Sequence, residues 1–201
     1  MKRNQSFYIA CIFLVVITYQ LYQYVKHPYD LKCIVSDVNG KKYCVRNRQR
    51  LTESVDLMAR VTVKMEEMVK YMKSHHPNDE RTKRLVAGFD PNVISETLPT
   101  STLTAYSENK GEKIAMCLNK NKKKGEDELI DLNTLTFVAL HEMSHIMTVS
   151  IGHKEEFWQN FKFLLENAQK ANIYTPTDYK KNSQVYCGMT LNNNPYFDGS
   201  K

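Results

Sequence analysis

Hydrophobic residues are most concentrated near the N-terminus, where residues 7–25 form a run without charged side chains. Basic Lys2 and Arg3 precede this run, and Lys26 follows it. A helix of about 20 mostly apolar residues is long enough to cross a bilayer. The pattern predicts an N-terminal membrane anchor over residues 1–26 that places residues 7–25 in the lipid bilayer of a single-pass membrane protein, such as one of a virion membrane.

A cleavable signal peptide is the alternative for this segment. Its most apolar part, residues 9–17, has the length of a signal-peptide core, and Lys2 and Arg3 would form the basic start of that peptide. This alternative implies secretion. Because no small-x-small cleavage motif follows in the sequence, the uncleaved anchor is preferred.

Residues 27–201 are expected to form one compact domain. Between residues 51 and 72, apolar residues recur every three or four positions, which predicts a long amphipathic helix with a methionine-rich buried face. A short helix is expected over residues 79–88, and a further amphipathic helix over residues 157–172.

Strands are expected in two places. Residues 101–109 and 112–118 have extended patterns and are joined by a turn at Asn109-Lys110-Gly111, which predicts an antiparallel hairpin. A second hairpin is expected between Cys33 and Cys44. The predicted fold class is therefore α+β, with a small antiparallel sheet and flanking helices.

The cysteines leave several pairings open. Four of them lie in the expected domain: Cys33, Cys44, Cys117 and Cys187. Three disulfide connectivities are possible, and unpaired core cysteines are a further alternative. A turn centred between Val38 and Asn39 would place Cys33 opposite Cys44, whereas a turn centred on Asn39-Gly40 would separate them.

Composition and charge change this interpretation little. The chain has 201 residues, of which 42% are hydrophobic and 25% charged, which excludes wholesale disorder and fibrous repeats. The net charge is +6, and lysines cluster at positions 120–124 without aromatic residues between them. This cluster is interpreted as a solvated loop, and no nucleic-acid partner is expected.

The most informative segment is a strongly apolar stretch that contains His141, Glu142 and His145. Apolar residues surround these three on almost every side, which predicts a helix buried in the domain core that begins near Asn133 or Thr134. Histidines four residues apart lie about 40° apart around a helix, so both imidazoles can bind one metal ion. Zn2+ is the expected cofactor because it accepts neutral imidazole nitrogens.

A catalytic zinc site needs a third protein ligand and an open position. His153 is the expected third ligand, because Gly152 before it is a typical helix-ending residue and lets the chain turn back. Three carboxylates remain as alternatives for this ligand: Glu155, Glu156 and Glu166.

Glu142 is expected to be the catalytic residue. It lies about 100° around the helix from His141, so it faces a water at the metal instead of the metal itself. In this position the carboxylate can accept a proton from the water and later donate it to the leaving amine.

These residues resemble the zincin metallopeptidases. The segment VALHEMSHIMTVSIGH followed by EEFW is similar to the minimal zincins of the WLM and SprT-like type. The resemblance implies a zinc-dependent peptidase acting on protein or peptide substrates, with His141, His145 and His153 as ligands and Glu142 as acid/base, in a minimal zincin-like fold. YSENKG, MCL and YCGM also resemble membrane-anchored metalloproteases of large eukaryotic DNA viruses.

Two functions follow from these expectations. The first is a zinc metallopeptidase tethered to a membrane, in which residues 101–109 form an edge strand that pairs with extended substrate. The alternative is a non-catalytic membrane or virion structural protein with a structural or vestigial zinc site. Glu142 favours the peptidase, because a purely structural site normally has four protein ligands and no use for a nearby carboxylate. Tyrosines that could stabilise an oxyanion are Tyr106, Tyr174 and Tyr186.

Overall fold

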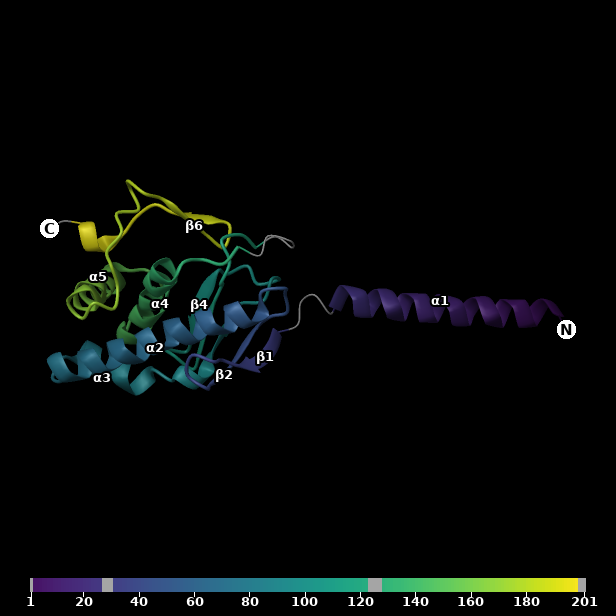
Figure 1. Ribbon diagram of the computed structural model, residues 1–201, viewed down its shortest axis with the longest axis horizontal. Coiled ribbons are helices and arrows are strands. Elements are labelled where there is room, and N and C mark those ends of the chain that lie inside the picture. The colour runs from purple at the N-terminus through teal and green to yellow at the C-terminus, as the bar shows by residue number, and fades with distance from the viewer. Residues whose placement is uncertain (1, 27–30, 123–127, 199–201) are drawn as a thin grey trace.

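The chain forms an N-terminal helix followed by an α+β domain, as the computed structural model shows for residues 2–26, 31–122 and 128–198. Helix α1 (Lys2–Lys26) projects away from the remaining elements (Figure 1). The α+β class predicted from the sequence is thereby confirmed. Lys123 and Lys124 of the lysine cluster fall in residues 123–127, outside the described residues.

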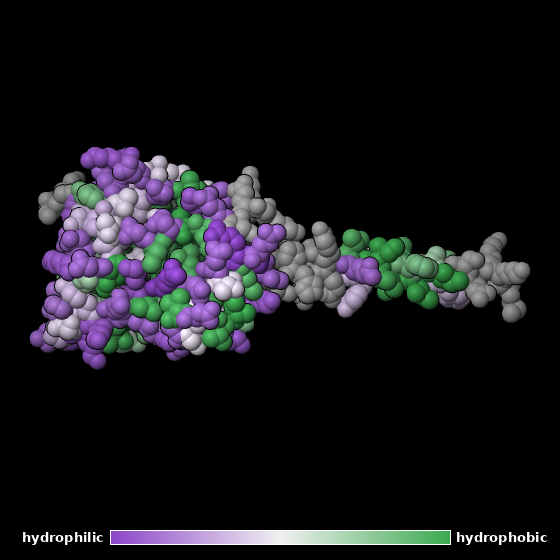
Figure 2. All heavy atoms as spheres, viewed as in Figure 1, coloured by the Kyte–Doolittle hydropathy of each residue, from purple (hydrophilic) through white to green (hydrophobic). Residues whose placement is uncertain are grey.

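The membrane prediction requires correction. Hydrophobic side chains are exposed along α1 (Figure 2), but no helix among the described residues combines the length and apolar character needed to cross a bilayer. The continuous apolar stretch at residues 9–17 rises only about 14 Å, roughly half the thickness of a hydrocarbon core. Polar Thr18 and Gln20 follow it. The single-pass anchor over residues 7–25 and the membrane localisation are therefore wrong.

Two helices, α2 (Leu51–His75) and α3 (Glu80–Gly88), lie between the second and third strands in the chain. Helix α2 buries the predicted methionine-rich face, including Met58, Met65, Met68 and Met72. Helix α3 begins where expected, because the Asp79 carboxylate accepts a hydrogen bond from the backbone N–H of Arg81. Both helices pack against the later helix α4 (Leu132–Met147).

Five strands form one sheet in the order β1-β2-β3-β5-β4. Their bounds are β1 (Leu31–Val35), β2 (Lys42–Arg46), β3 (Ile94–Glu96), β4 (Ala105–Glu108) and β5 (Lys113–Met116). The predicted hairpins are confirmed as β1–β2 and β4–β5. The sheet is mixed and not antiparallel as predicted, because β3 pairs in parallel with both β2 and β5. Helices α2 and α3 supply the long crossover that a parallel β2–β3 pair requires.

Two disulfides join parts of the domain. Cys33 lies opposite Cys44 in the β1–β2 pair, and the two residues form a disulfide. This strand register is the one expected for a turn centred between Val38 and Asn39. The second disulfide joins Cys117, just after β5, to Cys187. Cys187 lies between β6 (Gln184–Tyr186) and β7 (Met189–Leu191), so this disulfide fixes the C-terminal hairpin to the end of β5.

Helix α4 occupies the centre of the core. Most of its residues are buried, and α2, α3, β4 and α5 (Glu155–Lys170) all contact it. The N-cap is Asp131 and not Asn133 or Thr134 as predicted, because the Asp131 carboxylate accepts hydrogen bonds from the backbone N–H and the hydroxyl of Thr134. The Asn133 side chain instead bonds the backbone of Thr175.

Candidate metal centre

Three histidines meet at the junction of α4 and α5. His141 and His145 lie one helical turn apart on α4, and His153 lies in the loop that leads to α5. Their candidate ligand atoms all lie within 4.8 Å of one another, and the Nε2 atoms of His141 and His153 are 2.9 Å apart. Two nitrogens bonded to one tetrahedral Zn2+ are about 3.3 Å apart. The structure thus brings together three histidines that could bind a metal ion.

The path to His153 differs from the sequence-based expectation. Helix α4 ends at Met147, with Thr148 as its C-cap, so Gly152 does not end the helix. Gly152 instead has a φ of 80° within the loop, a left-handed conformation that glycine adopts without strain. The loop places the exposed His153 beside the other two imidazoles.

An aromatic cluster on α5 supports the imidazoles. The buried ring of Phe157 contacts all three histidines, with centroid distances of 4.8 Å to His141, 4.3 Å to His145 and 4.7 Å to His153. Trp158 lies 5.7 Å from His153. Phe157 is expected from the sequence on a face of an amphipathic helix, and the EEFW segment was the available signal for its contact with the histidines.

The electrostatic environment keeps the imidazoles neutral at pH 7. Burial, followed by proximity to His145 and His153, lowers the pKa of His141 to about 3. Burial, followed by proximity to His153, lowers the pKa of His145 to about 4. Burial also lowers the pKa of His153. Neutral imidazoles have the free nitrogen lone pair that a metal ligand requires.

Glu142 is a buried carboxyl group next to this cluster in the sequence. Only 3% of the residue is exposed, and its Oε2 atom has no hydrogen-bond partner among the described residues. Burial raises the pKa of Glu142 to about 8. A buried carboxyl oxygen without a partner is costly, so this atom fits a site where a bound cation or its water would interact with it.

The alternative carboxylate ligands are placed elsewhere. Glu156 accepts hydrogen bonds from the backbone N–H groups of Val149 and Ser150, at 2.9 and 3.0 Å. The Glu155 carboxylate accepts a hydrogen bond from Gln159. Among the described residues, the group whose ligand atoms converge contains histidines alone, so neither glutamate joins it, nor does Glu166.

The tyrosine candidates have other partners. The hydroxyl of buried Tyr186 accepts a hydrogen bond from the backbone N–H of Cys117 and donates one to the carbonyl of Thr104. Tyr174 accepts from Asn194. Lys113 lies over the ring of Tyr106. These contacts explain the three tyrosines structurally without assigning any of them to an oxyanion.

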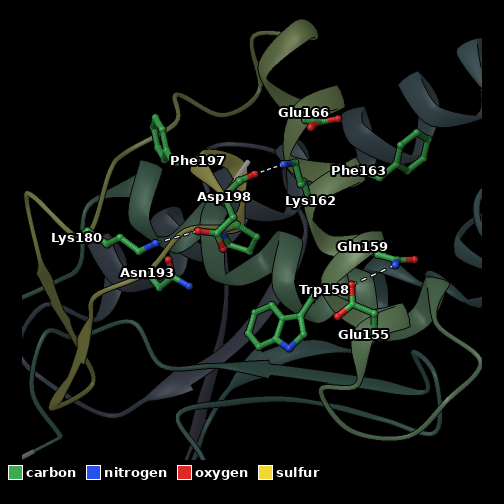
Figure 3. Close-up of a pocket in the computed structure, with 11 residues that line it drawn as sticks. Glu155, Trp158, Gln159, Lys162, Phe163, Glu166, Lys180, Asn193, Phe197 and Asp198 are labelled. Carbon is green, nitrogen blue, oxygen red and sulfur yellow. Dashed lines mark hydrogen bonds and ion pairs between the residues drawn. The ribbon is translucent and has the colours of Figure 1, made fainter. Parts of the chain in front are cut away.

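A pocket of about 940 Å³ lies between α5 and the C-terminal segment, which we define as residues 180–198; Trp158 is one of its lining residues (Figure 3). Phe163 and Phe197 contribute further aromatic walls. Lys180 donates to the Asp198 carboxylate at 2.9 Å, which helps to hold the C-terminal segment in place. Trp158 both contacts His153 and lines this pocket, but none of the three histidines is among the lining residues.

Three viral proteins are similar in sequence to this chain. An uncharacterized protein of Acanthamoeba polyphaga mimivirus is 26% identical over 162 residues, which cover 79% of this chain and 81% of the relative. An uncharacterized protein of Invertebrate iridescent virus 6 is 34% identical over 43% of this chain and 47% of its own length. One of Invertebrate iridescent virus 3 is 31% identical over 50% of this chain and 59% of its own length. The viral part of the resemblance is thereby confirmed.

No family model matches the chain. Among solved structures, Wss1 from Saccharomyces cerevisiae is similar with a TM-score of 0.48 and 17% sequence identity, over 64% of this chain and 87% of Wss1.

Proposed function

We propose that this chain is a zinc-dependent metallopeptidase in which His141, His145 and His153 bind Zn2+ and Glu142 is the catalytic acid/base. The observation that carries the proposal is the combination of three neutral imidazoles, with ligand atoms within 4.8 Å of one another, and a buried carboxyl oxygen without a partner among the described residues. Three ligands leave a tetrahedral zinc one open position, which a catalytic site needs and a structural site normally fills.

Bound at this site, Zn2+ would polarise the scissile carbonyl and increase the acidity of a water molecule. In the proposed mechanism, Glu142 would accept the proton of that water through its Oε2 atom, which has no partner among the described residues, and then donate it to the leaving amine. Burial raises the pKa of Glu142 in the metal-free chain, and the positive charge of a bound Zn2+ would favour the ionised carboxylate that can accept a proton. Phe157 excludes water from one side of the imidazoles.

Strand β4 is the proposed binding surface for the substrate backbone. It forms an edge of the sheet, pairs with β5 on one side, and contacts the histidine-bearing helix α4. An extended peptide could add to this edge by backbone hydrogen bonds, which give affinity with little dependence on side-chain identity. The substrate class proposed here is therefore an extended segment of protein or peptide.

The test uses the zinc-loaded full-length chain and a diverse peptide mixture analysed by mass spectrometry. We expect new peptide termini that disappear with a chelator, return with added Zn2+, and decrease strongly with Glu142→Gln. A folded chain that binds zinc without cleaving any peptide would contradict the peptidase proposal and favour a non-catalytic zinc protein.

A further inference from the structure

The loop that carries His153 has few apolar contacts of its own to hold it. We call residues 148–153, between α4 and α5, the ligand loop. Val149 is 66% exposed and Ile151 is 85% exposed, and His153 is also exposed. Whereas helical hydrogen bonds fix His141 and His145, the position of His153 therefore depends on other contacts to the loop backbone.

Glu156 bonds the ligand loop from the side of α5. Its Oε1 atom accepts a hydrogen bond from the backbone N–H of Val149, and its Oε2 atom accepts one from Ser150. These two backbone donors, followed by the side chain of Ser150, lower the pKa of Glu156 to about 2. The carboxylate is therefore ionised at neutral pH and holds two consecutive peptide groups of the loop.

Lys110 bonds the carbonyl oxygens of the same loop, whereas Glu156 bonds its backbone N–H groups. Its Nζ atom donates to the carbonyl oxygens of Thr148 at 2.6 Å and Ser150 at 3.0 Å. Lys110 lies in the β4–β5 turn with a φ of 60°. Ser150 thus has its backbone N–H bonded to Glu156 and its carbonyl bonded to Lys110.

Two glycines allow the β4–β5 turn to come this close. A Cβ atom on Gly111 would lie 2.1 Å from the carbonyl oxygen of Gly88 at the end of α3. A Cβ atom on Gly88 would lie 2.7 Å from both the carbonyl oxygen of Lys110 and the Cγ2 atom of Ile146 on α4. The turn therefore packs directly against α3 and α4, which fixes the backbone that carries Lys110.

We propose that Lys110 and Glu156 are positioning residues for His153, holding the ligand loop so that its imidazole stays beside those of His141 and His145. This inference rests on the proposed zinc site. Ordering the residues of a flexible loop costs conformational entropy. If these bonds order the loop before the metal arrives, that cost does not weaken zinc binding.

The direction in which zinc affinity changes when Lys110 is replaced distinguishes positioning from simple electrostatics. The positively charged Lys110 side chain bonds the loop that carries His153, so its charge would oppose the binding of another cation. Its removal would therefore strengthen zinc binding if charge alone mattered. Positioning predicts the opposite result, weaker zinc binding in Lys110→Met.

The experiment measures the zinc affinity of full-length variants by competition with a chromophoric chelator. We expect Lys110→Met and Glu156→Gln each to weaken binding by roughly 10-fold or more, as is typical when residues that orient metal ligands are lost. Lys110→Arg, which keeps the donors, should restore most of the affinity. Glu155→Gln is the matched control, because it removes the same charge from the same helical turn without a loop contact, and should stay within about twofold of wild type.

Each variant is also made in a His153→Ala background, and thermal unfolding in chelator verifies the fold. Positioning through His153 predicts no further loss of zinc affinity in that background. Unchanged or tighter zinc binding in Lys110→Met, or an equal loss with and without His153, would overturn the inference. If either variant fails to fold, the other one carries the test, since the two side chains bond the loop independently.

Failure of this inference differs from failure of the proposed function. Wild-type zinc affinity in both variants, together with peptide cleavage, would overturn the positioning role alone. Weakened zinc binding in the variants of a chain that cleaves no peptide would overturn the peptidase alone. A wild-type chain that binds no zinc would overturn both.

Discussion

Substitution of Glu142 by glutamine should make the metal-free protein more stable. In the zinc-loaded protein, the same substitution should abolish most of the peptide cleavage. Glu142 is 3% exposed and its Oε2 atom has no partner among the described residues, so ionisation inside the fold is unfavourable. Glutamine has nearly the same shape and remains neutral at every pH. The variant therefore removes the cost of a buried charge together with the proton acceptor.

The magnitude follows from the pKa of Glu142, which burial raises from 4.5 to about 8. Because the unfolded chain releases this proton first, the free energy of unfolding of the metal-free wild type falls as pH rises from about 4.5 to 8. Each pH unit in this interval corresponds to about 1.4 kcal/mol. At pH 7 the wild type should therefore be less stable than Glu142→Gln by about 3 kcal/mol, equivalent to a difference in Tm of roughly 6–12 °C.

The assay compares thermal unfolding of both proteins in chelator at pH 4 and pH 7. The difference should be small at pH 4, where the carboxyl group is protonated in both states, and near its full value at pH 7. With zinc restored, peptide cleavage by the variant should be lower by roughly 100- to 10,000-fold, the usual contribution of a general base. A variant that is less stable than wild type at pH 7 would refute the burial argument, and equal cleavage would refute the catalytic role.

Three further predictions concern the third ligand, the close-packed turn and the second disulfide. His153→Ala should keep the fold but bind zinc far more weakly, as measured by metal content after dialysis; full retention of zinc would exclude His153 as a ligand. Gly111→Ala should lower the Tm and weaken zinc binding together, because the new Cβ would lie 2.1 Å from the carbonyl oxygen of Gly88; an unchanged Tm in a calorimetric scan would contradict this packing. Replacing Cys117 and Cys187 by alanine should cost about 4 kcal/mol in the free energy of unfolding, from the loop entropy of their sequence separation of 70; urea unfolding measures this, and a loss below about 1 kcal/mol would contradict the entropic account.

Local patterns in the sequence determined the helices, two of the hairpins and the centre of the site, but not β3, β6 or β7. The spacing of apolar residues predicts α2 and its buried methionines, because helical periodicity depends only on residues a few positions apart. The same periodicity places His141 and His145 on one face of α4, whatever the rest of the fold does. The turn at Asn109-Lys110-Gly111 is equally local, and the structure confirms the hairpin there.

Only the tertiary structure decided how these elements combine. The parallel pairing of β3 with β2 and β5 and the Cys117–Cys187 disulfide join residues far apart in the chain. The contacts of Phe157 with His141 and His145 depend on how α5 packs against α4. The same is true of the ligand loop, where Lys110 approaches from a different hairpin. A sequence displays the chemical groups available for such contacts, but their partners are selected by packing the whole chain, since long-range pairs gain their energy only when the surrounding core has closed.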